Sequence, residues 1–180
     1  MDTRKDLLKA RERWKQHCDT VQAATAVNIC ETPAQRLARI RRLRADYAAF
    51  VDYYFPHWTV NPETGKSTPC APFHIDAANK ILKNRNLKAG FMWHRGAAKS
   101  TNMDVFVPMW LMAQDLCRDR EAGRPNGRQI NVMVLVGKSE DNARTLLGDI
   151  QAELQFNQRY IADFGPQYNA GSWEDGEFVT

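Results

Sequence analysis

The pattern of apolar and polar positions predicts helices through the first third of the chain. Residues 3–25 carry loosely spaced apolar positions among charges, as in a helix with one weakly apolar face. Thr32 then stands as an N-cap, with Pro33 at the first helical position and Gln35 at the third. This capping-box pattern predicts a helix that runs to about Tyr54. Its expected buried face consists of Leu37, Ile40, Tyr47, Phe50, Val51 and Tyr54.

Three further helices are predicted in the rest of the chain. A short one covers residues 72–84, beginning with Pro-Phe-His, and a longer one covers about 99–115 with a bend near Pro108. Ser139 is placed to cap a third helix, which ends near Asn157.

Two apolar runs predict β-strands between these helices. Residues 88–93 form the first, and residues 130–136 form the second, whose nearly continuous apolar run is typical of a parallel strand buried on both faces. Residues 173–180 are expected to begin another strand. Strands that alternate with helices predict an α/β fold with a parallel sheet flanked by helices and a helical amino-terminal region. Two strands are few for a stable sheet, so we expect an incomplete domain.

Composition agrees with a single globular domain. The chain has 180 residues, of which 43% are hydrophobic and 26% charged. No apolar stretch approaches the roughly 18 residues that a transmembrane helix requires, so we expect no membrane association. The cysteines are scattered without a C-x-x-C pair, which indicates free thiols in a reducing compartment; they are Cys18, Cys30, Cys70 and Cys117.

The positive charge is concentrated near the amino terminus. Residues 1–44 contain 11 Lys or Arg and 5 Asp or Glu, a net of +6, whereas the remainder has a net of −2. A basic region of this kind suits nucleic acid or an acidic partner protein. A solvated helix surface explains the same charges, and both interpretations stay open.

Residues 93–101 are the one segment whose sequence suggests a specific chemical function; they read Trp-His-Arg-Gly-Ala-Ala-Lys-Ser-Thr. A predicted strand enters this segment and a predicted helix leaves it, which is the setting of a phosphate-binding loop. The usual pattern is G-x-x-x-x-G-K-[ST], and here Trp93 and Ala98 stand at its two glycines. Lys99 would reach the β- and γ-phosphates and Ser100 would hold a magnesium ion. Ala98 is tolerable there if its φ is negative. The alternative is a basic turn without a ligand.

Two other Lys-Ser elements compete with this one. Residues 64–68 read Thr-Gly-Lys-Ser-Thr, but no useful strand precedes them and prolines follow, so we interpret them as a surface turn. Residues 137–139 read Gly-Lys-Ser and directly follow the predicted strand, which leaves no loop to surround a phosphate. We interpret them as an ordinary strand-to-helix turn in which Ser139 is the N-cap.

Three segments in order resemble the large terminase subunits of tailed bacteriophages. The Arg-Gly-Ala-Ala-Lys-Ser-Thr run of residues 95–101 resembles their deviant Walker A loop. The Pro-Phe-His of residues 72–74 resembles a segment that precedes that loop in many members. Residues 142–157, followed by Asp-Phe-Gly at 163–165, resemble the helix and the "FG" ending after the second strand. The likeness extends over residues 45–180 and leaves the first 30 residues uncovered.

The resemblance implies a P-loop NTPase-like fold and an ATP-driven motor that packages viral double-stranded DNA into capsids, with ATP and Mg²⁺ as cofactors. Arg95 and Lys99 would be the catalytic residues, with Arg95 stabilising charge on the γ-phosphate. Ser100 would be the magnesium ligand. The whole nucleotide-binding set would be Arg95, Gly96, Ala97, Ala98, Lys99, Ser100 and Thr101.

The same resemblance implies an organisation and a set of partners. Residues 1–31 would be a helical, mobile leader, and residues 32–180 the amino-terminal part of the ATPase domain, without its Walker B acids or the nuclease domain. We therefore expect weak or absent nucleotide binding and no appreciable hydrolysis by these residues alone. The implied partners are DNA, the portal protein, the small terminase subunit and other copies in a ring, in the host cytoplasm during virion assembly.

Two alternatives to a terminase stay open. One is a non-enzymatic basic module that binds DNA or a partner protein, and the arginines of residues 36–44 support it. The other is a different P-loop NTPase, such as a helicase.

Overall fold

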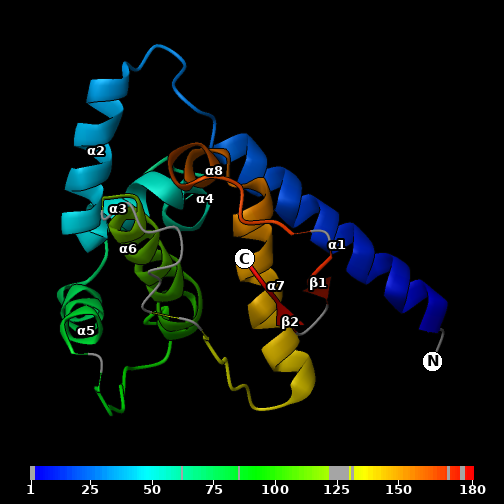
Figure 1. The fold of residues 1–180 in the computed structure, drawn as a ribbon. Coiled ribbons are helices and arrows are strands. Elements are labelled where there is room, and N and C mark those ends of the chain that lie inside the picture. Colours follow the sequence, from blue (N-terminus) through cyan, green and yellow to red (C-terminus); the bar gives the residue numbers. More distant parts are fainter. Residues whose placement is uncertain are drawn as a thin grey trace.

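The described chain is mostly helical (Figure 1). The structure is a computed structural model that describes residues 3–61, 63–84, 86–121, 130, 132–169, 171–174 and 177–180. Its helical elements are α1 (Thr3–Ala24), α2 (Pro33–Ala45), α3 (Tyr47–Tyr54), α4 (Pro56–Thr59), α5 (Pro72–Lys83), the π-helical η1 (Thr101–Phe106), α6 (Val107–Glu121), α7 (Glu140–Phe156) and α8 (Gln158–Phe164). The strands are β1 (Trp173–Glu174) and β2 (Glu177–Phe178).

The predicted parallel sheet flanked by helices, the P-loop NTPase-like fold, is wrong. The only sheet among the described residues is the two-stranded antiparallel pair of β1 and β2, in which Trp173 is opposite Phe178 and Glu174 is opposite Glu177. This pair lies in the expected 173–180 region. It is too small to organise the fold, and helix packing does so instead.

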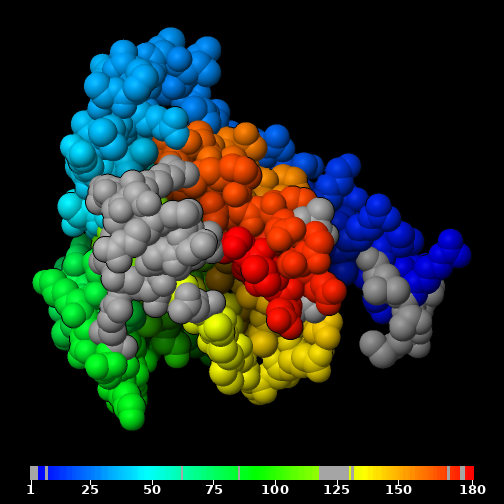
Figure 2. All heavy atoms as spheres, viewed as in Figure 1, coloured from blue at the N-terminus to red at the C-terminus, as the bar shows by residue number. Residues whose placement is uncertain are grey.

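Neither of the two predicted internal strands forms. Within the described residues, no backbone hydrogen bond joins 88–93 or 132–136 to another segment; Asn131 lies outside these residues. Met92 is 97% exposed and Val136 is 89% exposed. The segment that leads into α7 is the yellow stretch of ribbon in Figure 1. The green segment at the lower left of Figure 2 protrudes from the body. An apolar run shows that a segment can be a strand, but the strand forms only where a second segment completes its hydrogen-bond ladder.

The helix predicted to run from residue 33 to 54 starts as expected and is broken at Asp46. The Thr32 hydroxyl accepts the Gln35 amide at 3.3 Å, and the Gln35 side chain accepts the Thr32 amide at 2.9 Å, so the capping box is confirmed. The Asp46 carboxylate accepts the amide of Ala49 at 3.1 Å and starts α3 as a second N-cap. The change of direction leaves Leu37 48% exposed, whereas the other residues of the predicted face are buried.

Aromatic side chains from α3, η1, α6 and α8 form the centre of the core. The Phe55 and Phe106 rings stack with centroids 4.8 Å apart, and Tyr47 meets Trp110 edge-on at 5.1 Å. The fully buried aromatics are Tyr47, Phe50, Tyr54, Phe55, Trp110, Tyr160 and Phe164. Helix α3 supplies three of these seven rings and its C-cap, Phe55, a fourth, and α2, α4 and α5 all contact this helix.

A buried carboxylate ties α2 to α8. Asp163 accepts the Arg36 Nε at 3.0 Å, the Arg39 Nη2 at 3.1 Å and the Tyr54 hydroxyl at 2.7 Å. Arg39 also donates twice to Glu31, and this hydrogen bonding lowers the pKa of the Glu31 carboxyl. These charge-assisted bonds fix α2 against the end of the chain.

The first helix matches its prediction and packs with its second half only. Val21 and Cys18 are buried, and the Trp14 ring lies against Gly148 of α7. Residues 8–16 are exposed, and this end of α1 projects from the body (blue in Figure 2). All four cysteines are free, as expected. None of the described helices has the length and apolarity to cross a membrane.

Candidate functional site

The candidate phosphate loop connects the protruding segment 88–93 to a long helix. The Ala97 amide donates to the His94 carbonyl at 3.2 Å, which closes a tight turn. Gly96 has a φ of +86°, a conformation that glycine adopts without strain. Within 94–101, Ala97 is buried and Thr101 half-buried, and the remaining side chains are exposed. All seven predicted site residues are therefore together on one surface turn and the helix that follows it.

Ala98 has a φ of +48°, so the condition under which alanine is tolerable at this position of a phosphate loop, a negative φ, is not met. The left-handed region costs a non-glycine residue about 1–2 kcal/mol. Such strain persists only where the surroundings hold it, and it is concentrated at functional sites. Ala98 stands at the second glycine position of the phosphate-loop pattern, where glycine would adopt this φ freely.

Two contacts turn the loop carbonyls inward. His74 Nε2 lies 2.8 Å from the Ala97 carbonyl oxygen, and His74 is buried on α5. The Ala98 carbonyl accepts the Asn102 backbone amide at 3.0 Å and the Asn102 side-chain amide at 3.2 Å. Asn102 is itself held by the Tyr47 hydroxyl, which donates to its Oδ1 at 3.0 Å. The loop is thereby tied to α5 on one side and to the aromatic core on the other.

The backbone amides at the same place remain available. Among the described residues, no acceptor meets the amides of Ala98, Lys99 or Ser100. These groups lie where the helix begins, and the helix continues through η1 and α6 to residue 121. Unpaired amides at the start of a long helix, with its partial positive charge, can bind an anion.

The helix behind the loop is wound more loosely than an α-helix in its first turns. In η1 the Val107 amide bonds to the Asn102 carbonyl, five residues back. Pro108 follows; it has no amide, and its ring would collide with the carbonyl of Asp104 in an α-helix. The bend predicted near Pro108 therefore takes the form of a π-helical turn, a feature often found at functional sites.

Three polar side chains surround the free amides. Arg95, Lys99 and Ser100 are exposed. Burial raises the pKa of the Asp104 carboxyl, and the nearby charge of Lys99 opposes this rise. Residues 95–100 therefore carry two exposed cationic side chains, an exposed hydroxyl and unpaired amides. These groups suit a phosphate group and a metal ion bound to it.

An aromatic cluster borders the loop. The Phe73 ring lies 5.2 Å from Trp93 and 6.2 Å from His94, and Trp93 lies 5.0 Å from His74. Phe73 is 37% exposed, so part of its ring faces solvent beside the turn. The cluster fixes the entry to the loop and provides an aromatic surface next to it.

The two rival Lys-Ser elements are turns, as predicted. Val60 and Ser67 form an isolated antiparallel bridge that closes the first of these turns, and residues 63–68 are exposed. The Ser139 hydroxyl accepts the Asn142 amide at 3.3 Å and caps α7. A Cβ on Gly137 would lie 2.7 Å from the Ala143 amide, so the chain before α7 has no room for a phosphate.

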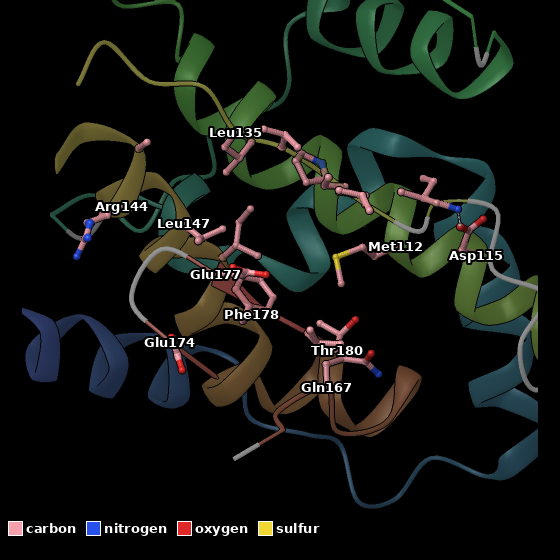
Figure 3. A pocket seen from close by; sticks show the side chains of 18 of the residues that line it. Met112, Asp115, Leu135, Arg144, Leu147, Gln167, Glu174, Glu177, Phe178 and Thr180 are labelled. Atoms are coloured by element: carbon pink, nitrogen blue, oxygen red, sulfur yellow. Dashed lines mark hydrogen bonds between the residues drawn. The ribbon is translucent and has the colours of Figure 1, made fainter. Parts of the chain in front are cut away.

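A larger hollow lies elsewhere, between α6, residues 132–136, α7 and the strand pair (Figure 3). Its volume is about 810 Å³, and none of its lining residues belongs to the loop at 94–101. Its lining is apolar, including Met112, Leu135 and Phe178, with four acidic side chains and one arginine around it. This chemistry does not suit a phosphate.

Comparisons with protein-family models, curated proteins and solved structures found no match for this chain. Sequence interpretation favoured core packing for His74 over a place near the adenine, and it missed the contact of His74 with the loop backbone. The signal for it was local: Pro72 at the first helical position places His74 at the third, from which a side chain reaches back beyond the helix start. No local sequence pattern indicates the hydrogen bond between Tyr47 and Asn102, because it joins residues far apart in the chain.

Proposed function

We propose that residues 94–101 bind the phosphates of ATP with Mg²⁺, and that the chain is the amino-terminal ATPase portion of a large terminase of a tailed bacteriophage. One observation carries the proposal: the Ala98, Lys99 and Ser100 amides are unpaired at a helix start, with the carbonyls of Ala97 and Ala98 turned away from them. The terminase assignment is supported by the Arg-Gly-Ala-Ala-Lys-Ser-Thr sequence of the same loop. The parallel sheet that the resemblance also implies is not present among the described residues, so the proposal rests on the loop alone.

Each residue has a role that follows from its chemistry. The three amides and Lys99 bind the β- and γ-phosphates, and the Ser100 hydroxyl is a ligand of Mg²⁺. The guanidinium of Arg95 is a bidentate donor for the γ-phosphate. Double-stranded DNA, the portal protein and the small terminase subunit are the partners in this proposal, and a ring of copies on the portal is the assembly.

The test is titration of the 180-residue chain with MgATP by calorimetry, for the wild type and two lysine variants. Lys99→Ala removes a charge-assisted contact worth about 1.5–3 kcal/mol, so we expect affinity to fall roughly 10- to 150-fold. Lys66→Ala is the matched control, since it removes the same charge from the Gly-Lys-Ser-Thr turn of residues 65–68. The proposal requires measurable, though weak, MgATP binding by these residues, so equal effects of the two substitutions, or no binding at all by the wild type, would contradict it.

A second function is favoured by the projecting end of α1. Its exposed residues 8–16 include Lys9, Arg11, Arg13 and Lys15, with Glu12 as the only acidic side chain among them. Such a surface suits the phosphate backbone of DNA, whose binding weakens steeply with salt. Salt-sensitive DNA binding without MgATP binding would favour this non-enzymatic module over the ATPase.

A further inference from the structure

His74 joins α5 to the candidate phosphate loop through a hydrogen bond. It is the third residue of α5, after Pro72, and its backbone amide donates to the Ala71 carbonyl at 2.9 Å. Its ring is buried, at 8% exposure, between the Phe73 ring, 4.4 Å away, and the Trp93 ring, 5.0 Å away. The orientation of the imidazole is therefore fixed by packing.

Both ring nitrogens of His74 have partners, and the partners determine the tautomer. The Ala71 amide donates to Nδ1 at 3.2 Å, so Nδ1 carries no proton. Nε2 lies 2.8 Å from the Ala97 carbonyl, which can only accept. The neutral imidazole with its proton on Nε2 satisfies both bonds. His74 thus joins the start of α5 to the loop with one donor and one acceptor.

The bond to Ala97 also sets the direction of the next amide. In a trans peptide the carbonyl and the following N–H point in opposite directions. Because His74 draws the Ala97 carbonyl toward α5, the N–H of Ala98 points away from α5. Asn102 does the same for the next peptide, since it holds the Ala98 carbonyl along the helix and so directs the Lys99 amide outward.

We propose that His74 is the positioning residue of the phosphate loop: its Nε2–H bond to the Ala97 carbonyl holds the 97–98 peptide so that the Ala98 amide faces the bound phosphate. This inference rests on the proposed nucleotide-binding function of residues 94–101. It also explains how Ala98 is kept at a φ of +48°, because rotation of the strained peptide would break the bond to His74. His74 touches no phosphate itself.

The test uses two substitutions of His74 and one control on another helix. His74→Phe keeps a ring in the packing and removes both hydrogen bonds. His74→Gln keeps an acceptor for Ala71 and a donor for Ala97 in one amide group. Gln35→Ala removes the corresponding hydrogen bond at the start of α2, in which the Thr32 amide donates to the Gln35 side chain at 2.9 Å. This substitution leaves the loop unchanged. Each protein is measured by hydrogen exchange of a peptide containing residues 95–100, by urea unfolding and by MgATP titration.

We expect His74→Phe to speed exchange of the loop peptide and to weaken MgATP binding about tenfold, the effect of one hydrogen bond. His74→Gln should restore both measurements to near the wild-type values. Gln35→Ala should lower the urea midpoint and leave the loop and the nucleotide affinity unchanged.

The outcomes separate this inference from the function on which it rests. Unchanged loop exchange in His74→Phe would overturn the positioning role, whatever happens to nucleotide binding. Equal losses of MgATP affinity in His74→Phe and Gln35→Ala would also overturn it, since both would then act through general stability. Faster loop exchange in His74→Phe, with no MgATP binding by the wild type, would support His74 as the holder of the loop and refute the nucleotide proposal.

Discussion

Helices α2 and α5 begin with the same local design and are attached to the rest of the chain by different chemistry. In both, proline is the first helical residue, and the third residue, Gln35 or His74, bonds back to the amide of the N-cap. The N-caps have nearly identical dihedral angles, with φ −71° and ψ 156° at Thr32 and φ −68° and ψ 153° at Ala71. After these first turns, the two helices differ in the contacts that attach them to the rest of the chain.

The attachment of α2 is charged, whereas that of α5 to the loop is a neutral hydrogen bond. Arg36 and Arg39 reach a carboxylate, Asp163, that is 2% exposed. His74 instead reaches a backbone carbonyl on an exposed turn. A buried ion network is costly to break and fixes a helix permanently. A single neutral bond changes stability little but controls the direction of a peptide, which suits a site that must fit a ligand.

The largest effect is expected at the charged attachment. Asp163→Asn removes the negative charge that Arg36, Arg39 and the Tyr54 hydroxyl share. Breaking a buried ion pair costs about 3–5 kcal/mol, so the free energy of unfolding in urea should fall by that amount. Asp141→Asn, an exposed acidic position on α7, is the control and should change it by less than about 0.5 kcal/mol. If Asp163→Asn lowers the free energy of unfolding by less than about 1 kcal/mol, then the charged attachment of α2 is no stronger than the neutral attachment of α5.

The next effect concerns the strain that the neutral attachment holds. Ala98→Gly places at φ +48° the one residue type that adopts it freely. Unfolding in urea should then require about 1 kcal/mol more, less than the full penalty because glycine also gains freedom in the unfolded chain. A lower free energy of unfolding in Ala98→Gly would mean that residue 98 does not adopt a positive φ. Glycine would then relieve no strain in the folded protein and would only increase the entropy of the unfolded chain.

The smallest effects test the shared helix start. Thr32→Ala removes the side-chain oxygen that accepts the Gln35 amide, and α2 should lose about 1 kcal/mol. Ala71→Ser adds the missing oxygen to α5, whose N-cap has the same backbone angles, and should gain about 0.5–1 kcal/mol. Thermal midpoints by circular dichroism measure both. If Ala71→Ser gives no gain, then the two helix starts are not equivalent.

Local signals were sufficient for the helices and insufficient for the sheet. Thr32, Pro33 and Ser139 act within three residues of themselves, so the starts of α2 and α7 could be predicted from sequence. Asp46 also acts locally as a cap, and the single helix predicted through it ignored that signal. The strands predicted at 88–93 and 130–136 required partners that no local pattern names.

The candidate loop shows the same division between local and distant contacts. Its residue types and the helix after it follow from the sequence of 94–101. The inward carbonyls do not, because His74 and Tyr47 act over 23 and 55 residues of chain. The positive φ of Ala98 also could not be predicted, since alanine ordinarily avoids that region and only these distant contacts maintain it.

The exposed valines before α7 have a practical consequence for handling the protein. Val132 and Val134 are each 77% exposed on an extended segment, and within the described residues 132–136 have no backbone partner. Short uncharged runs rich in β-branched residues and lacking proline stack readily into intermolecular β-structure. We therefore expect folded molecules to associate through residues 132–136 as the protein concentration rises. A charged residue within the apolar segment 132–136, as in Val134→Lys, would disfavour this β-association and leave the candidate loop unchanged.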